Sequence, residues 1–130
     1  MDTKAKASLL FADETYALVG AALEVRNFLG VGFLEAVYQE ALSYECLLRN
    51  IPVKMQVELP IRYKDTVLTK RYLADLIAYE KIIVELKTVP ELTSRETAQL
   101  INYLKASGYR LGLIFNFGHA KRFEWKRFVV

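Results

Sequence analysis

The sequence predicts a mixed β-sheet flanked by helices, an α/β fold that is α+β by element order. Apolar residues recur at helical spacing up to about position 49, and strand-like runs begin at Val53. One more helical segment stands between two groups of strands, which gives the order ααβββ(β)αββ and is typical of a sheet with covered faces. At 130 residues we expect a single domain over residues 1–130.

Two helices are expected before the first strand. The first is expected to begin at Ser8 or Asp13, either of which can cap it, and to end near Leu29. The second is expected over residues 33–49, where Asn50 is a plausible stop. Glycines between the two segments favour a break rather than one long helix.

The middle of the chain favours strands. Residues 53–63 alternate loosely, and Pro60 indicates an edge strand or a bulge. A short strand is expected over 67–70, followed by two strongly apolar strands over 72–79 and 82–89 with a hairpin tip between them.

The last third predicts a helix and two strands. Thr93 and Glu96 fit a capping box for a helix over residues 95–107. Strands are expected over 109–115 and 122–130.

Composition limits the classes of protein. Cys46 is the only cysteine, so an internal disulfide is excluded, and its apolar helical surroundings favour a packed thiol. The N-terminus lacks the apolar core of a signal peptide, and no apolar run approaches the roughly 20 residues that span a bilayer. We therefore expect a cytoplasmic protein with no membrane segment. The net charge of +3 permits nucleic-acid binding without arguing for it.

Charged residues interrupt the two apolar strands. The run YLADLIAY contains Asp75, and the run IIVELKTV contains Glu85 and Lys87. Folding the hairpin about position 80 places Asp75 opposite Glu85, and strand side chains alternate with period two, so we expect the charged residues to share one face. Charges among Leu, Ile and Val are costly unless they are paired or coordinate a metal. The alternatives are a metal site and a buried salt-bridge cluster.

The residue types at this face suit phosphodiester hydrolysis. Mg²⁺ prefers oxygen ligands and keeps several waters, so Asp75 and Glu85 would be sufficient, with the carbonyl of Leu86 as a further ligand. Lys87 would position the attacking water and offset developing negative charge.

Two helices carry residues that can join this face. Gln99 and Tyr103 are four residues apart, and Glu35 and Tyr38 are three apart, so each pair shares a helix face. Gln99 and Tyr103 could equally form an ordinary half-buried helix face. Glu35 could simply favour the helix N-terminus through the dipole.

The segment Gly32-Phe33-Leu34-Glu35-Ala36-Val37-Tyr38 resembles the Gly-x-x-Glu-x-x-Tyr signature of a family of small prokaryotic proteins. That family is similar to the RecB-like branch of the PD-(D/E)xK nuclease superfamily. The resemblance runs from about residue 18 to residue 130. It includes Asp75, the triplet Glu85-Leu86-Lys87, residues 99–104 and residues 111–118.

The resemblance implies a restriction-endonuclease-like PD-(D/E)xK core. Carried over by position, the catalytic set is Glu35, Asp75, Glu85, Lys87, Gln99 and Tyr103. The three carboxylates would bind Mg²⁺ or Mn²⁺, Lys87 would assist the water, and the last two would support the site. Two departures stand out: Ala74 replaces the Pro of the superfamily name, and no His precedes Glu35.

The expected function is therefore metal-dependent hydrolysis of nucleic acid, with DNA as the substrate and a homodimer as a possible assembly. The alternative is a non-catalytic module that binds nucleic acid or protein on the same fold. The small size and modest positive charge of the chain favour that alternative.

Overall fold

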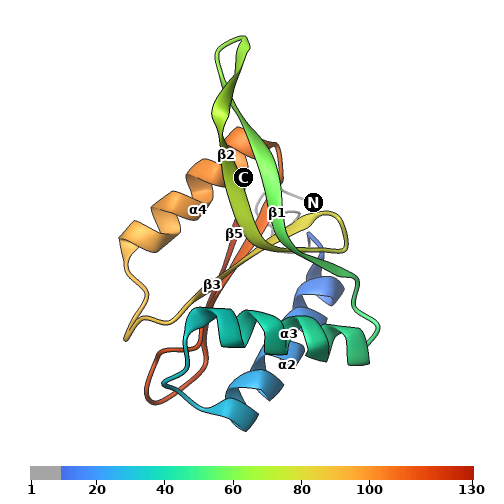
Figure 1. The fold of residues 1–130 in the computed structure, drawn as a ribbon, viewed down its shortest axis with the longest axis vertical. Coiled ribbons are helices and arrows are strands. Elements are labelled where there is room, and N and C mark those ends of the chain that lie inside the picture. The colour runs from blue at the N-terminus through green and yellow to red at the C-terminus, as the bar shows by residue number, and fades with distance from the viewer. Residues whose placement is uncertain (1–9) are drawn as a thin grey trace.

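The computed structural model describes residues 10–130 and arranges them as a mixed five-stranded sheet with helices on both faces (Figure 1). The elements are α2 (Ala12–Leu29), α3 (Glu35–Leu48), β1 (Val53–Tyr63), β2 (Thr66–Ala78), β3 (Ile82–Lys87), α4 (Ser94–Ser107), β4 (Leu111–Asn116) and β5 (Glu124–Val129). This architecture confirms the predicted fold class.

The strands are ordered β1-β2-β3-β4-β5 across the sheet. β3 and β4 are parallel, and the other neighbours are antiparallel. A parallel pair needs a long crossover, which α4 supplies between β3 and β4. Pro60 lies in the edge strand β1, where the register shifts between Pro60 and Arg62, as its position in the sequence predicted.

The sheet buries apolar side chains on both faces. On one face, α2 and α3 pack against a cluster that includes Leu76, Val84 and Leu86. On the other, Leu100 and Leu104 of α4 belong to a second cluster on the sheet. A fully buried Leu contributes about 1.5–3 kcal/mol relative to an exposed one, so the two clusters anchor the helices to the central strands.

The helix starts differ from the expected ones at α2 and α3. Phe11, with φ 53°, is the N-cap residue of α2 and makes no side-chain cap, so Asp13 lies in the first turn instead. Ser8 lies outside the described residues. The second helix starts at Glu35 and not at residue 33, because the backbone of Leu34 is extended, with φ −67° and ψ 152°. The capping box of Thr93 and Glu96 is confirmed.

The two strands expected over 67–70 and 72–79 are one continuous strand, β2. Its pairing with β1 runs from Tyr63↔Thr66 to Val53↔Ala78, so cross-strand hydrogen bonds keep the segment extended throughout. The far end of this hairpin projects beyond the rest of the fold (Figure 1).

Cys46 is completely buried in α3, and burial raises the pKa of its thiol to about 11. The expectation of a packed, unreactive thiol is therefore confirmed. No helix within residues 10–130 is both long and apolar enough to cross a membrane.

Gly118→Ala is expected to destabilise the fold. A Cβ there would lie 2.5 Å from the carbonyl carbon of Thr88 and 2.6 Å from the amide nitrogen of Val89. Backbone cannot move aside as a flexible side chain does, so we expect a loss of about 1–3 kcal/mol in the free energy of unfolding. Gly20→Ala is the matched control, since it removes a helical glycine and should add up to about 1 kcal/mol. Urea denaturation compares the two, and equal midpoints would contradict this packing.

Candidate metal centre

The hairpin of β2 and β3 turns where the sequence predicted. Residues 79–81 form the turn, and the ladder runs from Ala78↔Ile82 to Leu76↔Val84. The same register would next pair Asp75 with Glu85, but the ladder ends before them.

At this point, hydrogen bonds from backbone amides to side-chain carboxylates replace the backbone-to-backbone bonds of the ladder. The Leu86 amide donates to Asp75 Oδ2 at 2.8 Å, and the Asp75 amide donates to the Glu85 carboxylate. Each carboxylate is therefore held by an amide of the opposite strand. The strands separate, and both carboxylates are oriented at the resulting gap.

β1 is irregular opposite the same place. Gln56 stands across from Asp75, has φ 52°, and hydrogen-bonds the Asp75 carboxylate. Its Nε2 atom also donates to Oε1 of Gln39 on α3, at 2.8 Å. The amide side chain of Gln56 thus links the gap to the helix that carries Glu35.

The pleat of β2 reverses across this irregularity. In a regular strand, residues four apart point to the same face. Here Ala74 belongs to the cluster beneath α4, while Ala78 belongs to the cluster beneath α2 and α3. The residue types do not indicate this reversal, because both residues are alanines within the same strand-like segment.

Tyr72 is a site residue that the sequence reasoning missed. Its hydroxyl donates a short hydrogen bond to Oε1 of Glu85. Its ring stacks on Tyr103 of α4, with centroids 3.8 Å apart and planes 5° apart. Tyr103 therefore reaches the site through Tyr72, which it holds against Glu85. The available signal was the position of Tyr72, three residues before Asp75.

Gln99 lies on α4, four residues before Tyr103, and its part in the site stays a prediction. Glu96, three residues earlier, is close enough to Lys87 for the Lys87 charge to lower the pKa of Glu96, although its larger causes are the hydrogen bonds to Thr93. Tyr103 follows Gln99 by four residues, and such neighbours share a helix face. Gln99 itself is exposed, so its amide is free to meet a ligand at the open side of the site.

Tyr38 fixes the loop in front of Glu35. Its ring is fully buried and stacked on Phe117, with centroids 4.7 Å apart. Its hydroxyl donates to the Gly30 carbonyl at 2.6 Å and accepts from the Phe33 amide at 3.3 Å. Tyr38 therefore packs in the core and positions this loop, one turn of helix beyond Glu35.

The carboxylates share an electrostatic environment that disfavours negative charge. Burial is the main cause that raises the pKa of Glu35, Asp75 and Glu85, and the value for Glu85 reaches about 7. Asp75 raises the pKa of Glu35 further, and Glu35 does the same to Glu85. Lys87 opposes all three shifts, so these four side chains sense one another. A helix-dipole role alone would lower the pKa of Glu35.

The carboxylates do not form a closed ligand cluster. Within residues 10–130, no three Asp, Glu, His or Cys side chains are grouped closely enough to hold a metal ion. The donor set nevertheless suits a hard cation, because Mg²⁺ is commonly held by one or two carboxylates and several waters. A divalent cation would also offset the burial that raises the three pKa values and the repulsion that adds to it at Glu35 and Glu85.

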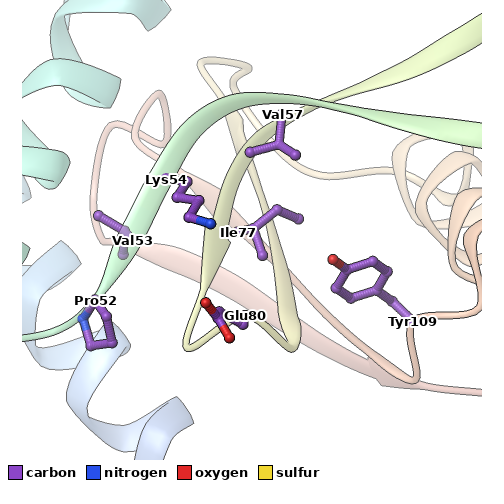
Figure 2. A pocket seen from close by; sticks show the side chains of 7 residues that line it. All are labelled: Pro52, Val53, Lys54, Val57, Ile77, Glu80 and Tyr109. Carbon is purple, nitrogen blue, oxygen red and sulfur yellow. The ribbon is translucent and has the colours of Figure 1, made fainter.

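Hollows lie at both ends of the sheet. One adjoins the site, and its lining residues are Val31, Gly32, Phe33, Tyr38, Thr88, Pro90, Phe117 and Gly118. Figure 2 shows another, of ≈ 280 Å³, lined by Pro52, Val53, Lys54, Val57, Ile77, Glu80 and Tyr109. None of the predicted site residues lines this second pocket, which lies toward the hairpin turn at the opposite end of β3.

Comparisons with known proteins agree with this arrangement. A family model described as the PD-(D/E)XK nuclease superfamily matches residues 12–128. The crystal structure of SSO0001 is similar, with a TM-score of 0.51 and 16% identity over 88% of this chain and 76% of that chain. This likeness supports the fold alone. No curated protein matches the chain.

The raised pKa of Glu85 predicts a pH-dependent stability in metal-free buffer with EDTA. Folded Glu85 keeps its proton up to about pH 7, whereas the unfolded chain loses it near 4.5. The contribution of Glu85 to the free energy of unfolding is therefore fully present below pH 4.5 and is lost as the pH rises through 7. Glu85→Gln should flatten this decline and add at most about 3 kcal/mol at pH 8.

The measurement is urea denaturation between pH 5 and pH 8. Glu58→Gln is the matched control, because it neutralises an exposed carboxylate on the edge strand β1 of the same sheet. If wild type and Glu85→Gln decline equally over this range, Glu85 is not the group that titrates.

Proposed function

Since the chain belongs to the PD-(D/E)XK nuclease superfamily, we propose that it is a metal-dependent nuclease that hydrolyses phosphodiester bonds in DNA. The observation that carries this proposal is the gap between β2 and β3, where Asp75 and Glu85 each bind the opposite strand and face Lys87. A purely structural ion pair would not need Glu35 to approach the same gap from a different helix.

The proposed metal ligands are Asp75 and Glu85, together with Glu35 and the carbonyl of Leu86. The Leu86 amide faces Asp75. The amide and carbonyl of one strand residue point to the same side, which supports a ligand role for this carbonyl. Bound Mg²⁺ or Mn²⁺ would polarise the phosphate and lower the pKa of a bound water.

The remaining residues have proposed roles of their own. Lys87 positions the attacking water and offsets negative charge on the phosphate. Gln99 hydrogen-bonds a phosphate oxygen or a ligand carboxylate from the exposed face of α4. Tyr103 supports Glu85 through Tyr72, which the stacked rings and the Tyr72 hydrogen bond favour.

The narrower resemblance to the Gly-x-x-Glu-x-x-Tyr family remains part of the proposal. Its signature residues have connected physical roles in this chain. Gly32 supplies a positive φ before α3, Glu35 starts the helix beside the carboxylates, and Tyr38 secures the loop. These roles support the view that the signature builds one wall of the site.

A non-catalytic binding module is the second candidate. The specific observation that favours it is the absence, within the described residues, of three grouped metal ligands. Amide and hydroxyl donors already satisfy part of both central carboxylates. In that case the fold would bind DNA or protein without a response to divalent metal.

Asp75→Asn and Lys87→Ala are each expected to reduce DNA cleavage by roughly 10²-fold or more while the fold is retained. The first removes a proposed ligand charge, and the second removes the cation beside the water. Glu40→Gln is the matched control, because Glu40 is exposed on α3 five residues beyond Glu35 and should leave the rate unchanged.

Cleavage is measured on circular duplex, linear duplex, single-stranded DNA and RNA, with Mg²⁺ or Mn²⁺, and thermal melting checks the fold of each variant. If the wild-type chain cuts none of these substrates with either metal, the nuclease proposal fails.

Metal binding is expected to give a single calorimetric isotherm for Mn²⁺ and to raise the Tm, since a ligand that binds only the folded state stabilises it. Glu85→Ala should abolish both effects. Glu85→Gln is a second variant that preserves side-chain volume. DNA binding with no metal effect on the Tm would instead favour the binding module.

A further inference from the structure

The far end of the β1–β2 hairpin extends beyond the other strands of the sheet and the hydrophobic clusters (Figure 1). We call residues 61–71 the hairpin arm. Every residue from Arg62 to Arg71 is exposed, and the turn lies at Lys64 and Asp65. About five residues on each strand give the arm a reach of roughly 17 Å. Ile61, at the base of the arm, packs against the cluster beneath α4, whereas residues 62–71 belong to neither cluster.

The arm carries the net positive charge of the chain. Its cations are Arg62, Lys64, Lys70 and Arg71, and its one acid is Asp65. This excess of three equals the formal net charge of +3 for all 130 residues, so the remainder of the sequence is formally neutral. The arm therefore presents a net positive charge on one projecting element, as expected for a surface that meets a polyanion.

The arm is continuous with the candidate metal centre. β2 leaves the arm at Arg71 and next places Tyr72 against Glu85, then Asp75 at the gap. Lys70 and Tyr72 are two residues apart in this strand, so their side chains point to the same face. A polyanion bound at the gap could therefore follow β2 outward onto the cations of the arm.

We propose that the hairpin arm binds double-stranded DNA by entering its major groove beside the phosphate held at the metal centre. This inference rests on the proposed function, since it assigns that site a duplex substrate. A two-stranded β-ribbon fits the major groove, which is about 12 Å wide. At the tip, Tyr63 is 61% exposed and Lys64 Nζ lies 5.5 Å from its ring centroid, which presents an aromatic ring and a cation together.

Exposed lysines on a sheet edge have another explanation, which is protection against edge-to-edge aggregation. That explanation requires charge but no contact with nucleic acid. Removal of the lysines would then cause self-association and leave DNA affinity unchanged, so the two explanations predict different measurements.

The test is fluorescence anisotropy with a labelled 20-base-pair duplex in EDTA, where cleavage cannot occur. Lys64→Ala/Lys70→Ala is expected to raise the Kd at least tenfold at 0.1 M salt. The slope of log affinity against log salt should fall by about 2, since each lost phosphate contact removes about 0.9. Arg62→Ala/Arg71→Ala is a second arm variant for use if the first one aggregates.

Arg110→Ala/Lys126→Ala is the matched control, because it removes two exposed cations outside the arm. Arg110 lies just before β4, at the end of the sheet opposite Lys87, and Lys126 lies on the edge strand β5. This control should bind the duplex as the wild type does. An equal loss of duplex affinity in both double variants would show a general effect of charge and would overturn the proposal for the arm.

Other outcomes separate the arm from the nuclease proposal. The proposal for the arm is overturned if the wild type binds no duplex, or if the arm variants bind the duplex with wild-type affinity. It is also overturned if the arm variants lose as much affinity for single-stranded DNA as for the duplex. If the wild type binds duplex through the arm but does not cleave DNA with metal, the proposal for the arm is supported and the nuclease proposal fails. If the wild type cleaves DNA but the arm variants bind duplex as the wild type does, the nuclease proposal is supported and the proposal for the arm fails.

Discussion

Two amide-to-carboxylate hydrogen bonds across the β2–β3 gap, from the Leu86 amide to Asp75 and from the Asp75 amide to Glu85, are the interaction on which the rest of the site depends. A carboxylate that accepts a backbone amide is oriented and partly compensated for its burial. Because β3 is central and covered on both faces, the gap cannot close by a shift of one strand alone. Each neighbouring helix then supports one side of it.

The two helical layers contribute different things to this gap. The layer of α2 and α3 brings Glu35, whose charge adds to the repulsion felt by Glu85, and fixes it through the buried hydroxyl of Tyr38. The α4 layer brings Tyr103, which acts through Tyr72. The cost of burying Asp75 and Glu85 is offset by hydrogen bonds from residues of β1, β2 and β3, and the excess negative charge is what a divalent cation would neutralise.

Local pattern was sufficient for the sheet, the hairpin turn and the capping box at Thr93, because each depends on residues close in sequence. The local pattern also placed Asp75 and Glu85 opposite each other on the two strands, because the turn between them is short. Tyr72 and Gln56 were missed because their roles arise from contacts between separate elements. The first helix was wrongly given Asp13 as its cap, since the left-handed backbone of Phe11 leaves no trace in composition.

By itself, the sequence determined the element order, the hairpin that opposes Asp75 and Glu85, and the net positive charge of residues 61–71, since these follow from periodicity and composition. Only the tertiary structure decided that the ladder stops at the gap, that the pleat reverses there, and that the charged segment projects into solvent. The physical reason is that periodicity fixes which residues face a common side, whereas packing between layers fixes where a strand must bend.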